Sequence, residues 1–439
     1  MTDAPRTGKF HLARGPVSGK ATDMNWCSML IIALITSVTS LAETVKFQST
    51  DWPTWRGLQG DGHAQAVEGL PLKWSITENV AWKTALPGRG HSTPTIVGDH
   101  IYLATAEADS QVQSVLCLAK ATGKLIWRTP VHTGKFLKGG NKHASHASSS
   151  VVCDGEQLYV TFPNDKQVFL TTLGMDGKVR WQQPVSDYVI HQGYGTSPMV
   201  YQNVVVAKAD SKHIGGAVVG FNKQTGKELW RIQRPKYPNY TTPVMVTAHD
   251  QLQMVFAGAE LITSLDPLTG KKHWEIKGST QECVTTTVTD GKRVFISGGW
   301  PKNHTMAVEA DGSGVVAWQN TTRVYVPSML VKSDQLYATM DAGFAVCWDS
   351  ATGKERWKER LGGAFFASPV LAGNRIYATN LAGKSYVFST DPKEFKLLAT
   401  NQLGEETYAS PVISGSRLYL RVTAKRDGRQ EWLYCIGKN

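Results

Sequence analysis

The sequence predicts an all-β protein, an eight-bladed β-propeller of four-stranded antiparallel blades in which an N-terminal strand closes the last blade. Two motifs recur along the chain at intervals of 40 to 56 residues, a length that fits four short strands. The composition agrees with many strands and turns, because the 439 residues include 41 Gly and 14 Trp but only 19% charged residues. Such sparse charge argues against a disordered or coiled-coil chain.

The first motif is Thr-Gly-Lys followed by a Trp, and it predicts the turn into the outermost strand of each blade. Full copies span residues 120–127, 222–230, 266–274 and 349–357, shorter copies span 175–181 and 310–318, and 390–397 is degenerate. The Gly supplies a left-handed backbone, and the Asp or Asn of several copies bonds the turn. The Trp is predicted to begin the outer strand and to wedge between neighbouring blades, where it buries a large apolar area. These docking residues are Trp82, Trp127, Trp181, Trp230, Trp274, Trp318 and Trp357.

The second motif is Ser-x-Pro, followed eight residues later by an aromatic residue or Val, and it predicts the innermost strand of each blade. Pro is tolerated there because it is the first residue of the strand. Runs such as 335–339 and 375–379 alternate with the period of two that is typical of strands. The Pro position and its equivalents are Pro94, Ser150, Pro198, Pro243, Thr287, Met329, Pro369 and Pro411, and these eight copies predict eight blades.

The repeat also predicts how the ring closes. The eighth repeat ends at residues 432–436 with no outer strand after it, whereas residues 79–84 read as an outer strand without a blade. Trp82 precedes Pro94 by 12 residues, which matches the spacing of the docking Trp and the next inner strand elsewhere in the chain. The N-terminal strand is therefore expected to complete blade eight, which removes the sheet edges that would otherwise be exposed.

The first 42 residues are predicted to be a leader. Residues 24–42 contain a short apolar run and end in the small residues Ser40 and Ala42, as in a secretory signal peptide cleaved after Ala42. The polar stretch upstream makes Met1 a doubtful start and leaves Met24 as the alternative. A buried N-terminal strand is the alternative interpretation of the apolar run.

We therefore expect an exported protein, periplasmic or extracellular, with an N-terminal extension over residues 43–70 and a propeller over residues 71–439. Cys27 lies in no lipoprotein motif, so no lipid anchor is expected. No later stretch is long and apolar enough for an integral membrane span.

The formal charge of +11 is spread along the chain rather than clustered. The densest basic patch, residues 425–429, has the composition of a hairpin tip. Nucleic-acid binding requires a basic face on a recognisable module, and neither is visible, so no nucleic-acid partner is expected. Weak attraction to anionic envelope surfaces is compatible with this charge.

On these motifs the chain resembles the PQQ-like, or quinoprotein-type, family of eight-bladed propellers over the mature chain from about residue 71. Residues 51–57, Asp-Trp-Pro-Thr-Trp-Arg-Gly, resemble the opening of exported planctomycete members. The resemblance implies one of three roles: a quinone-dependent dehydrogenase, a non-catalytic scaffold similar to the outer-membrane assembly lipoprotein, or the sensor ectodomain of a kinase.

The residues favour the non-catalytic role. The dehydrogenases bind pyrroloquinoline quinone with Ca²⁺ and an Asp base, commonly beside a Cys-Cys disulfide, but this sequence has no Cys-Cys pair and no Cys-x-x-Cys-His haem motif. No matched calcium-ligand set is visible either, so no catalytic residue, metal or cofactor is assigned. We predict a binding or scaffold module of the cell envelope with a protein or peptide partner. The alternative is a dehydrogenase of alcohols or sugars that uses pyrroloquinoline quinone and calcium.

Residues just before each inner strand are expected to line the mouth of the central channel. Three interpretations remain open for this ring: polar groups that bond backbone and water, a site for a small polar or aromatic molecule or a peptide, and a metal or quinone site. The binding candidates are His91, His143, His146, His191, Tyr194, Tyr240, Glu282, Tyr325 and Tyr408, and Phe365 has the same offset.

Five cysteines follow the leader. Cys117 and Cys347 lie at equivalent points of their repeats, six residues before the turn Gly, and Cys435 fits the matching strand of blade eight. Cysteines at equivalent positions of separate blades are far apart, so free, buried thiols are expected rather than disulfides.

Overall fold

The computed structural model describes residues 47–65, 68–426 and 428–438. The predicted leader, its cleavage site and the first residues of the extension lie outside this part of the chain. The described residues form 33 strands and no helix. Within them, no helix of membrane-spanning length and hydrophobicity occurs.

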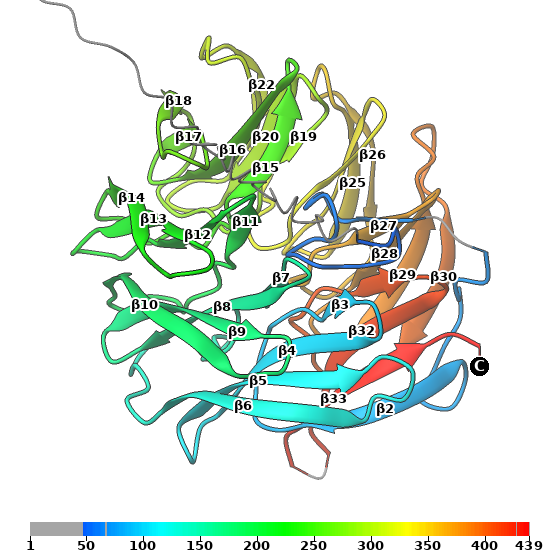
Figure 1. Ribbon diagram of the computed structural model, residues 1–439. Coiled ribbons are helices and arrows are strands. Elements are labelled where there is room, and N and C mark those ends of the chain that lie inside the picture. Colours follow the sequence, from blue (N-terminus) through cyan, green and yellow to red (C-terminus); the bar gives the residue numbers. More distant parts are fainter. Residues whose placement is uncertain (1–46, 66–67, 427, 439) are drawn as a thin grey trace, which may run out of the picture. The chain divides into compact units, whose positions relative to one another are not determined.

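Eight antiparallel sheets follow one another along the chain, and together they confirm the predicted eight-bladed propeller (Figure 1). Blade one is β3 (Thr95–Val97), β4 (His100–Glu107), β5 (Val112–Ala119) and β6 (Leu125–Thr133). Blade two is β7 (Val152–Cys153), β8 (Gln157–Asn164), β9 (Gln167–Gly174) and β10 (Val179–Asp187). Blade three is β11 (Met199–Tyr201), β12 (Val204–Ala209), β13 (Gly216–Asn222) and β14 (Glu228–Arg234). Blade four is β15 (Val244–Ala248), β16 (Gln251–Gly258), β17 (Leu261–Leu265) and β18 (Lys272–Lys277).

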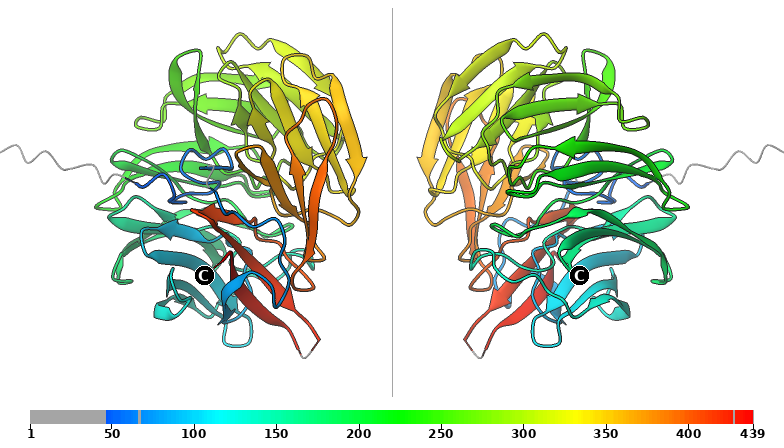
Figure 2. Two further views of the ribbon diagram at one scale, coloured as in Figure 1. Left: turned by 90° about the vertical axis from the view of Figure 1, so that its right-hand side faces the viewer. Right: turned by 90° about the vertical axis from the view of Figure 1, so that its left-hand side faces the viewer.

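The second half of the ring repeats the same order, and Figure 2 shows its blades from the side as twisted sheets. Blade five is β19 (Val288–Thr289), β20 (Arg293–Gly298), β21 (His304–Glu309) and β22 (Val316–Asn320). Blade six is β23 (Leu330–Lys332), β24 (Gln335–Thr339), β25 (Phe344–Asp349) and β26 (Glu355–Arg360). Blade seven is β27 (Val370–Ala372), β28 (Arg375–Thr379), β29 (Lys384–Ser389) and β30 (Leu397–Gln402). Blade eight holds β31 (Val412–Ser414), β32 (Arg417–Ala424) and β33 (Gln430–Ile436).

The predicted closure is confirmed. Strand β2 (Val80–Leu86) lies antiparallel to β33 as the fourth strand of blade eight, with Trp82 opposite Cys435. In Figure 1 the blue strand β2 lies beside the red strand β33. The two ends of the propeller thus share one sheet, and the predicted hairpin tip at residues 425–429 connects β32 to β33.

The docking tryptophans connect each blade to the next. All seven lie in the outermost strand, and six donate the indole N–H to a backbone carbonyl in the turn of the following blade, as Trp82 does to Lys120 over 3.1 Å. The turn Gly lies under the ring: a Cβ on Gly353, which has φ +68°, would come within 2.5 Å of the Trp318 ring. The Gly is therefore required both by the turn conformation and by the close approach of the Trp.

The inner strands begin where the Ser-x-Pro motif predicts, with one correction. In blade one Thr95 pairs with Tyr102, and in blade two Val152 pairs with Tyr159, so the residue equivalent to Pro94 is Val151 rather than Ser150. Blade two has no Pro at this point, and the motif alone did not fix its alignment to one residue.

A relay of hydroxyl groups joins the starts of the inner strands. The backbone N–H of Ser328 donates to Ser368 Oγ in the next blade over 2.9 Å, and equivalent bonds connect blades one to four and five to eight. These bonds satisfy backbone groups that face the channel and hold neighbouring blades in register.

Residues 48–64, which we call the floor segment, lie across the inner strands at the end opposite to the hydroxyl relay. Trp52 exchanges backbone hydrogen bonds with Ile96 of β3, and Pro53 accepts one from Cys153 of β7. Strand β1 (His63–Ala64) then pairs parallel with β27, where the blue segment is visible inside the ring (Figure 1). The segment thereby spans inner strands of distant blades.

All five cysteines in the described residues are free and buried, as predicted. Cys117 and Cys347 lie opposite docking tryptophans in the third strands of their blades, and Cys435 occupies the equivalent place opposite Trp82. Burial raises the pKa of the Cys117 and Cys347 thiols to about 12, so neither is poised as a nucleophile.

Candidate functional site

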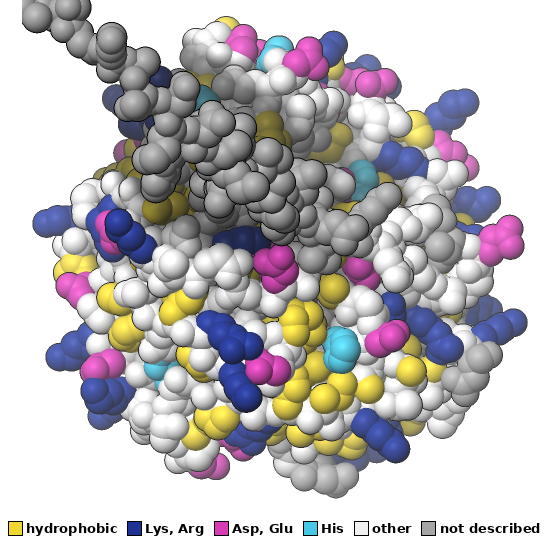
Figure 3. Space-filling view, viewed as in Figure 1, with side chains coloured by type: hydrophobic (Ala, Val, Ile, Leu, Met, Phe, Trp, Pro, Cys, Tyr) yellow, Lys and Arg dark blue, Asp and Glu magenta, His cyan; other side chains and the backbone are white. Residues whose placement is uncertain are grey.

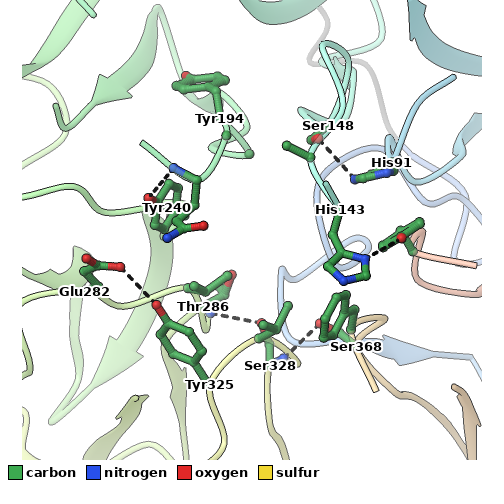
Figure 4. Close-up of a pocket in the computed structure, with 18 of the residues that line it drawn as sticks. His91, His143, Ser148, Tyr194, Tyr240, Glu282, Thr286, Tyr325, Ser328 and Ser368 are labelled. Carbon is green, nitrogen blue, oxygen red and sulfur yellow. Dashed lines mark hydrogen bonds between the residues drawn. The ribbon is translucent and has the colours of Figure 1, made fainter. Parts of the chain in front are cut away.

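The central channel holds a cavity of about 680 Å³, which we call the cup. Its walls come from the connectors that precede the inner strands of all eight blades and from the turns between the second and third strands of blades three, five and six. Figure 4 shows side chains from the connectors facing one another across the cup. Trp55 of the floor segment lies at the opposite end of the strands and lines the cup from below. The volume falls in the range of small-molecule sites.

The structure places eight of the nine predicted mouth residues in the wall of the cup, and His146 is the exception. The imidazole of His146 packs against the Phe136 ring in a tilted arrangement, with ring centroids 4.3 Å apart, and is not part of the cavity lining. Phe365 is fully buried against Tyr386, and its neighbour Phe366 lines the cup instead. The sequence distance of a residue from the inner strand therefore predicted which connectors form the wall. It did not predict which side chain of each connector lines the cup.

His143 contacts a residue that is distant in sequence but lies in a nearby blade of the closed ring. Its connector runs from blade one to blade two, yet its Nδ1 lies 2.8 Å from the Tyr408 hydroxyl of blade eight. Tyr408 donates its proton to Glu406 Oε1 over 2.9 Å, so its oxygen accepts from His143 Nδ1–H. Burial alone would raise the pKa of Glu406, but hydrogen bonds from Arg429, Tyr408 and Lys425 hold it below its ordinary value. A neutral His143 is thus left with Nε2 as an acceptor.

His91 stands beside this group and packs flat on the Tyr408 ring, with centroids 4.2 Å apart. Its Nδ1 lies 3.4 Å from Ser148 Oγ, as Figure 4 shows. Burial, reinforced by the nearby guanidinium of Arg89, holds the pKa of His91 well below its ordinary value. This imidazole is therefore neutral at physiological pH and contributes hydrogen-bonding capacity rather than charge.

The opposite wall is a chain of polar contacts around His191. Lys212 Nζ donates to His191 Nε2 over 3.3 Å, so the neutral imidazole carries its proton on Nδ1. That nitrogen lies 3.2 Å from the Tyr240 hydroxyl and 3.7 Å from Glu282 Oε1. Burial, with the Lys212 charge, lowers the pKa of His191 although Glu282 opposes the shift. Tyr325 completes the wall and donates to Glu282 Oε2 over 3.1 Å.

The floor was missed by the sequence analysis, which identified residues 51–57 only as a family-like opening. Trp55 donates its indole N–H to Thr286 Oγ1 over 2.8 Å, and Arg56, which is 3% exposed, donates to the Met329 carbonyl over 2.5 Å. Two Trp and one Arg in seven residues outside the repeat was the available signal. Further lining residues, which no sequence motif indicated, are Asn141, Gln192, Lys212, Trp300, Arg323, Asp341 and Phe366.

The carboxyl groups of the cup do not form a matched set of calcium ligands. Ca²⁺ takes six to eight oxygen ligands, which carboxylates, carbonyl groups and water supply. The two carboxyl groups in the lining are Glu282 and Asp341; Glu282 accepts from Tyr325 OH, and Asp341 accepts from the Tyr325 backbone N–H over 2.7 Å. Among the described residues, no three His, Cys, Asp or Glu side chains gather as a metal-binding group.

Eight blades, docking tryptophans and a central cup define the chain as a PQQ-like β-propeller. The chain belongs to the family described as outer membrane protein assembly factor BamB, whose profile matches residues 111–359 and 307–433. Outer membrane protein assembly factor BamB of Burkholderia pseudomallei is 26% identical over 329 residues, which is 70% of this chain and 76% of that protein. Serine/threonine-protein kinase AfsK of Streptomyces griseus is 27% identical over 170 residues, or 36% of this chain and 20% of the kinase.

Solved structures share the fold. BamB from Moraxella catarrhalis superposes with a TM-score of 0.57 at 14% identity, covering 80% of this chain and 95% of the other. A europium-containing methanol dehydrogenase gives a TM-score of 0.64 at 12% identity, covering 89% and 98%. At these identities the likeness establishes the architecture alone, and function depends on the site.

Proposed function

We propose that this chain is a non-catalytic binding module of the cell envelope, which presents the mouth of the cup to a protein or peptide partner. The family assignment supports an assembly-type propeller. The observation that carries the proposal is the cup itself, which Trp55 floors at one end while the connectors of all eight blades frame the other. A partner can therefore enter from one face only.

The wall chemistry supports binding over catalysis. The imidazoles of His91 and His191 are held neutral, and their contacts with Ser148, Tyr408, Lys212 and Tyr240 position them as parts of a fixed wall. Aromatic faces with a few convergent polar groups are the usual composition of a recognition pocket. Residues 24–42 and the family together favour an exported location.

The surface agrees with a site on the propeller axis. Lys and Arg side chains are scattered over the visible face, many of them along its periphery, and do not gather in one patch (Figure 3). This distribution supports a partner other than nucleic acid, whose phosphates are contacted by a continuous basic surface.

The test is affinity capture from an envelope extract at low salt, comparing wild type with the triple variant His91→Ala, His143→Ala, His191→Ala. His273→Ala, an exposed residue on β18, is the matched control. We expect one specific partner with wild type and the control, and its loss with the triple variant. Equal capture by all three proteins would contradict a role for the cup.

The dehydrogenase alternative has its own test. The purified protein is incubated with pyrroloquinoline quinone and Ca²⁺, and dye-linked oxidation of alcohols and sugars is measured. We expect no activity above the quinone alone, because the donor set does not fit calcium. Reconstituted turnover would refute the non-catalytic proposal.

A further inference from the structure

Glu282 and Asp51 are the two of the five buried carboxylates in the described chain that have no Lys or Arg partner, and of these two only Glu282 lines the cup. Three of the others are paired: Asp210 with Lys208 at 2.9 Å and Arg234 at 3.1 Å, Glu431 with Arg421 at 2.7 Å, and Glu406 with Lys425 at 3.2 Å. The fourth, Asp51, accepts backbone N–H groups from Gln48 and Gly98 instead. Glu282 is 5% exposed, and among the described residues no Lys or Arg nitrogen lies within 4 Å of its carboxylate.

The groups that do touch Glu282 leave most of its charge uncompensated. Tyr325 supplies one hydrogen bond, and the imidazole of His191, which is neutral for the reasons above, lies 3.7 Å away. A carboxylate has about four acceptor positions, so at least two remain for a ligand or water. Figure 4 shows the carboxylate on the same side of the cup as Tyr240 and Tyr325.

The cations of the lining are directed elsewhere. Lys212 Nζ donates to His191 Nε2, and the exposed Arg323 lies over the Tyr325 ring with its guanidinium carbon 4.8 Å from the centroid. Asp341 adds a second carboxyl group beside Tyr325, bonded to the Tyr325 backbone N–H. An isolated buried charge is costly unless it is paired, and a cation entering from the mouth would supply the missing partner.

We infer that Glu282 is a subsite for a cationic group, an alkylammonium or guanidinium carried on an apolar body that fills the aromatic part of the cup. The inference rests on the proposed function and deepens it, since a Lys or Arg side chain of a partner segment has this chemistry. Tyr240, Tyr325 and Trp300 line the same part of the cavity and offer aromatic surface to such a group. A free amine has the same chemistry, and the experiment separates these two sources.

The experiment measures binding to the purified chain by ligand-observed NMR with three probes that share a phenyl ring and differ in the tail. They are 2-phenylethylammonium, 2-phenylethanol and 3-phenylpropanoate. We expect the ammonium to bind about tenfold or more tightly than the propanoate, because hydrogen bonds between charged groups are the strong ones. Equal affinities, or a preference for the propanoate, would overturn the inference, because Lys212 and Arg323 would then dominate the cup.

Two isosteric variants locate the effect. Glu282→Gln is expected to remove the preference for the ammonium and to leave thermal stability unchanged or raised, since it deletes an unpaired buried charge. Glu260→Gln, an exposed carboxylate on the β16–β17 turn of the same face, is the matched control and should retain the preference. A preference that survives in Glu282→Gln would also overturn the inference. The ranking of the three probes on wild type does not depend on either variant folding.

A peptide arm distinguishes the sources of the cation. Acetyl-Ala-Lys-Ala-amide is compared with the same peptide carrying norleucine. Tighter binding of the Lys peptide than of the free amine supports a partner side chain, and the reverse order supports a free amine; both support the cationic subsite. If the ammonium preference fails while partner capture still depends on the mouth residues, the inference falls and the proposed function stands.

Discussion

Trp55 donates its indole N–H to Thr286 Oγ1 over 2.8 Å, a contact between the N-terminal segment and a connector 231 residues further along the chain. Thr286 takes part in the hydroxyl relay that joins the starts of the inner strands, since its backbone N–H donates to Ser328 Oγ. The floor of the cup is therefore attached to the same groups that set the register of the blades. A substitution in the floor segment is therefore expected to lower the stability of the propeller.

Trp55→Ala is expected to destabilise the propeller by roughly 2–3 kcal/mol, because it removes a large packed side chain and leaves a cavity. Trp55→Phe keeps most of the ring and loses the hydrogen bond, so it should cost about 1 kcal/mol. Urea unfolding followed by fluorescence measures both. An alanine variant as stable as wild type would show that the segment rests on the channel without supporting it.

A comparison of two docking tryptophans measures how much the indole hydrogen bond contributes to the stability of the propeller. Trp318 donates to the Ser350 carbonyl over 2.8 Å, whereas Trp274 Nε1 is buried and has no acceptor within the described part of the chain. Trp318→Phe should therefore destabilise by about 1–2 kcal/mol more than Trp274→Phe, since the loss of ring area is the same. Denaturant midpoints of the two variants test this directly, and equal midpoints would contradict it.

Alanine substitutions at Gly353 and Gly415 distinguish the cost of backbone strain from the cost of a steric clash. Both have positive φ, +68° and +58°, but only a Cβ on Gly353 meets the Trp318 ring, whereas a Cβ on Gly415 finds nothing within 4 Å. Gly415→Ala should cost roughly 1 kcal/mol for the left-handed conformation, and Gly353→Ala should cost roughly 1–3 kcal/mol more for overpacking. Thermal unfolding of the pair provides the comparison. The interpretation fails if Gly415→Ala is the more damaging change.

The buried triad of blade three predicts an acid-sensitive contribution to stability. Asp210 contacts Lys208 and Arg234, and all three side chains are at most 3% exposed. Burial alone would raise the pKa of Asp210, but Arg234 and Lys208 hold it below its ordinary value. Because the folded pKa lies below the unfolded one, the stabilisation is complete above about pH 4 and is lost as the pH falls through the folded value.

Asp210→Asn should accordingly cost roughly 3–5 kcal/mol at pH 7, since it leaves two buried cations without a carboxylate. The gap between the variant and wild type should narrow as the pH falls below 4. Urea titrations at pH 7 and pH 3 measure both effects. Asp109→Asn, which changes an exposed carboxyl on the β4–β5 turn, serves as the control. A gap for Asp210→Asn that does not change with pH would contradict the role of the triad.

Repetition explains why most of the fold was predictable. The turn Gly, the docking Trp and the inner-strand Pro recur along the chain, and each has the same structural role in every copy. A copy that is hard to assign can therefore be aligned with the others. The misplacement of Ser150 occurred in a blade that lacks the Pro. The spacing also predicted that Trp82 belongs to blade eight, because blade eight lacked an outer strand and the strand containing Trp82 lacked a blade.

The site was predictable only in outline, because its residues do not repeat. The offset from the inner strand located the cup wall, but rotamers and loop paths decide which side chains enter it. His143 contacts Tyr408 of blade eight, whereas His146, three residues later, packs against Phe136. The floor segment occurs once in the chain. No comparison between repeats could therefore indicate that Trp55 lies across the end of the channel.

Site-specific photocrosslinking in the living cell shows whether the partner enters the mouth of the cup. A benzophenone amino acid replaces Phe366 in the wall of the cup or, as the matched position, Leu397, which is 47% exposed on the outer strand of blade seven. We expect a specific adduct from position 366 and none from position 397. An adduct formed at 397 alone, or equally at both positions, would contradict it.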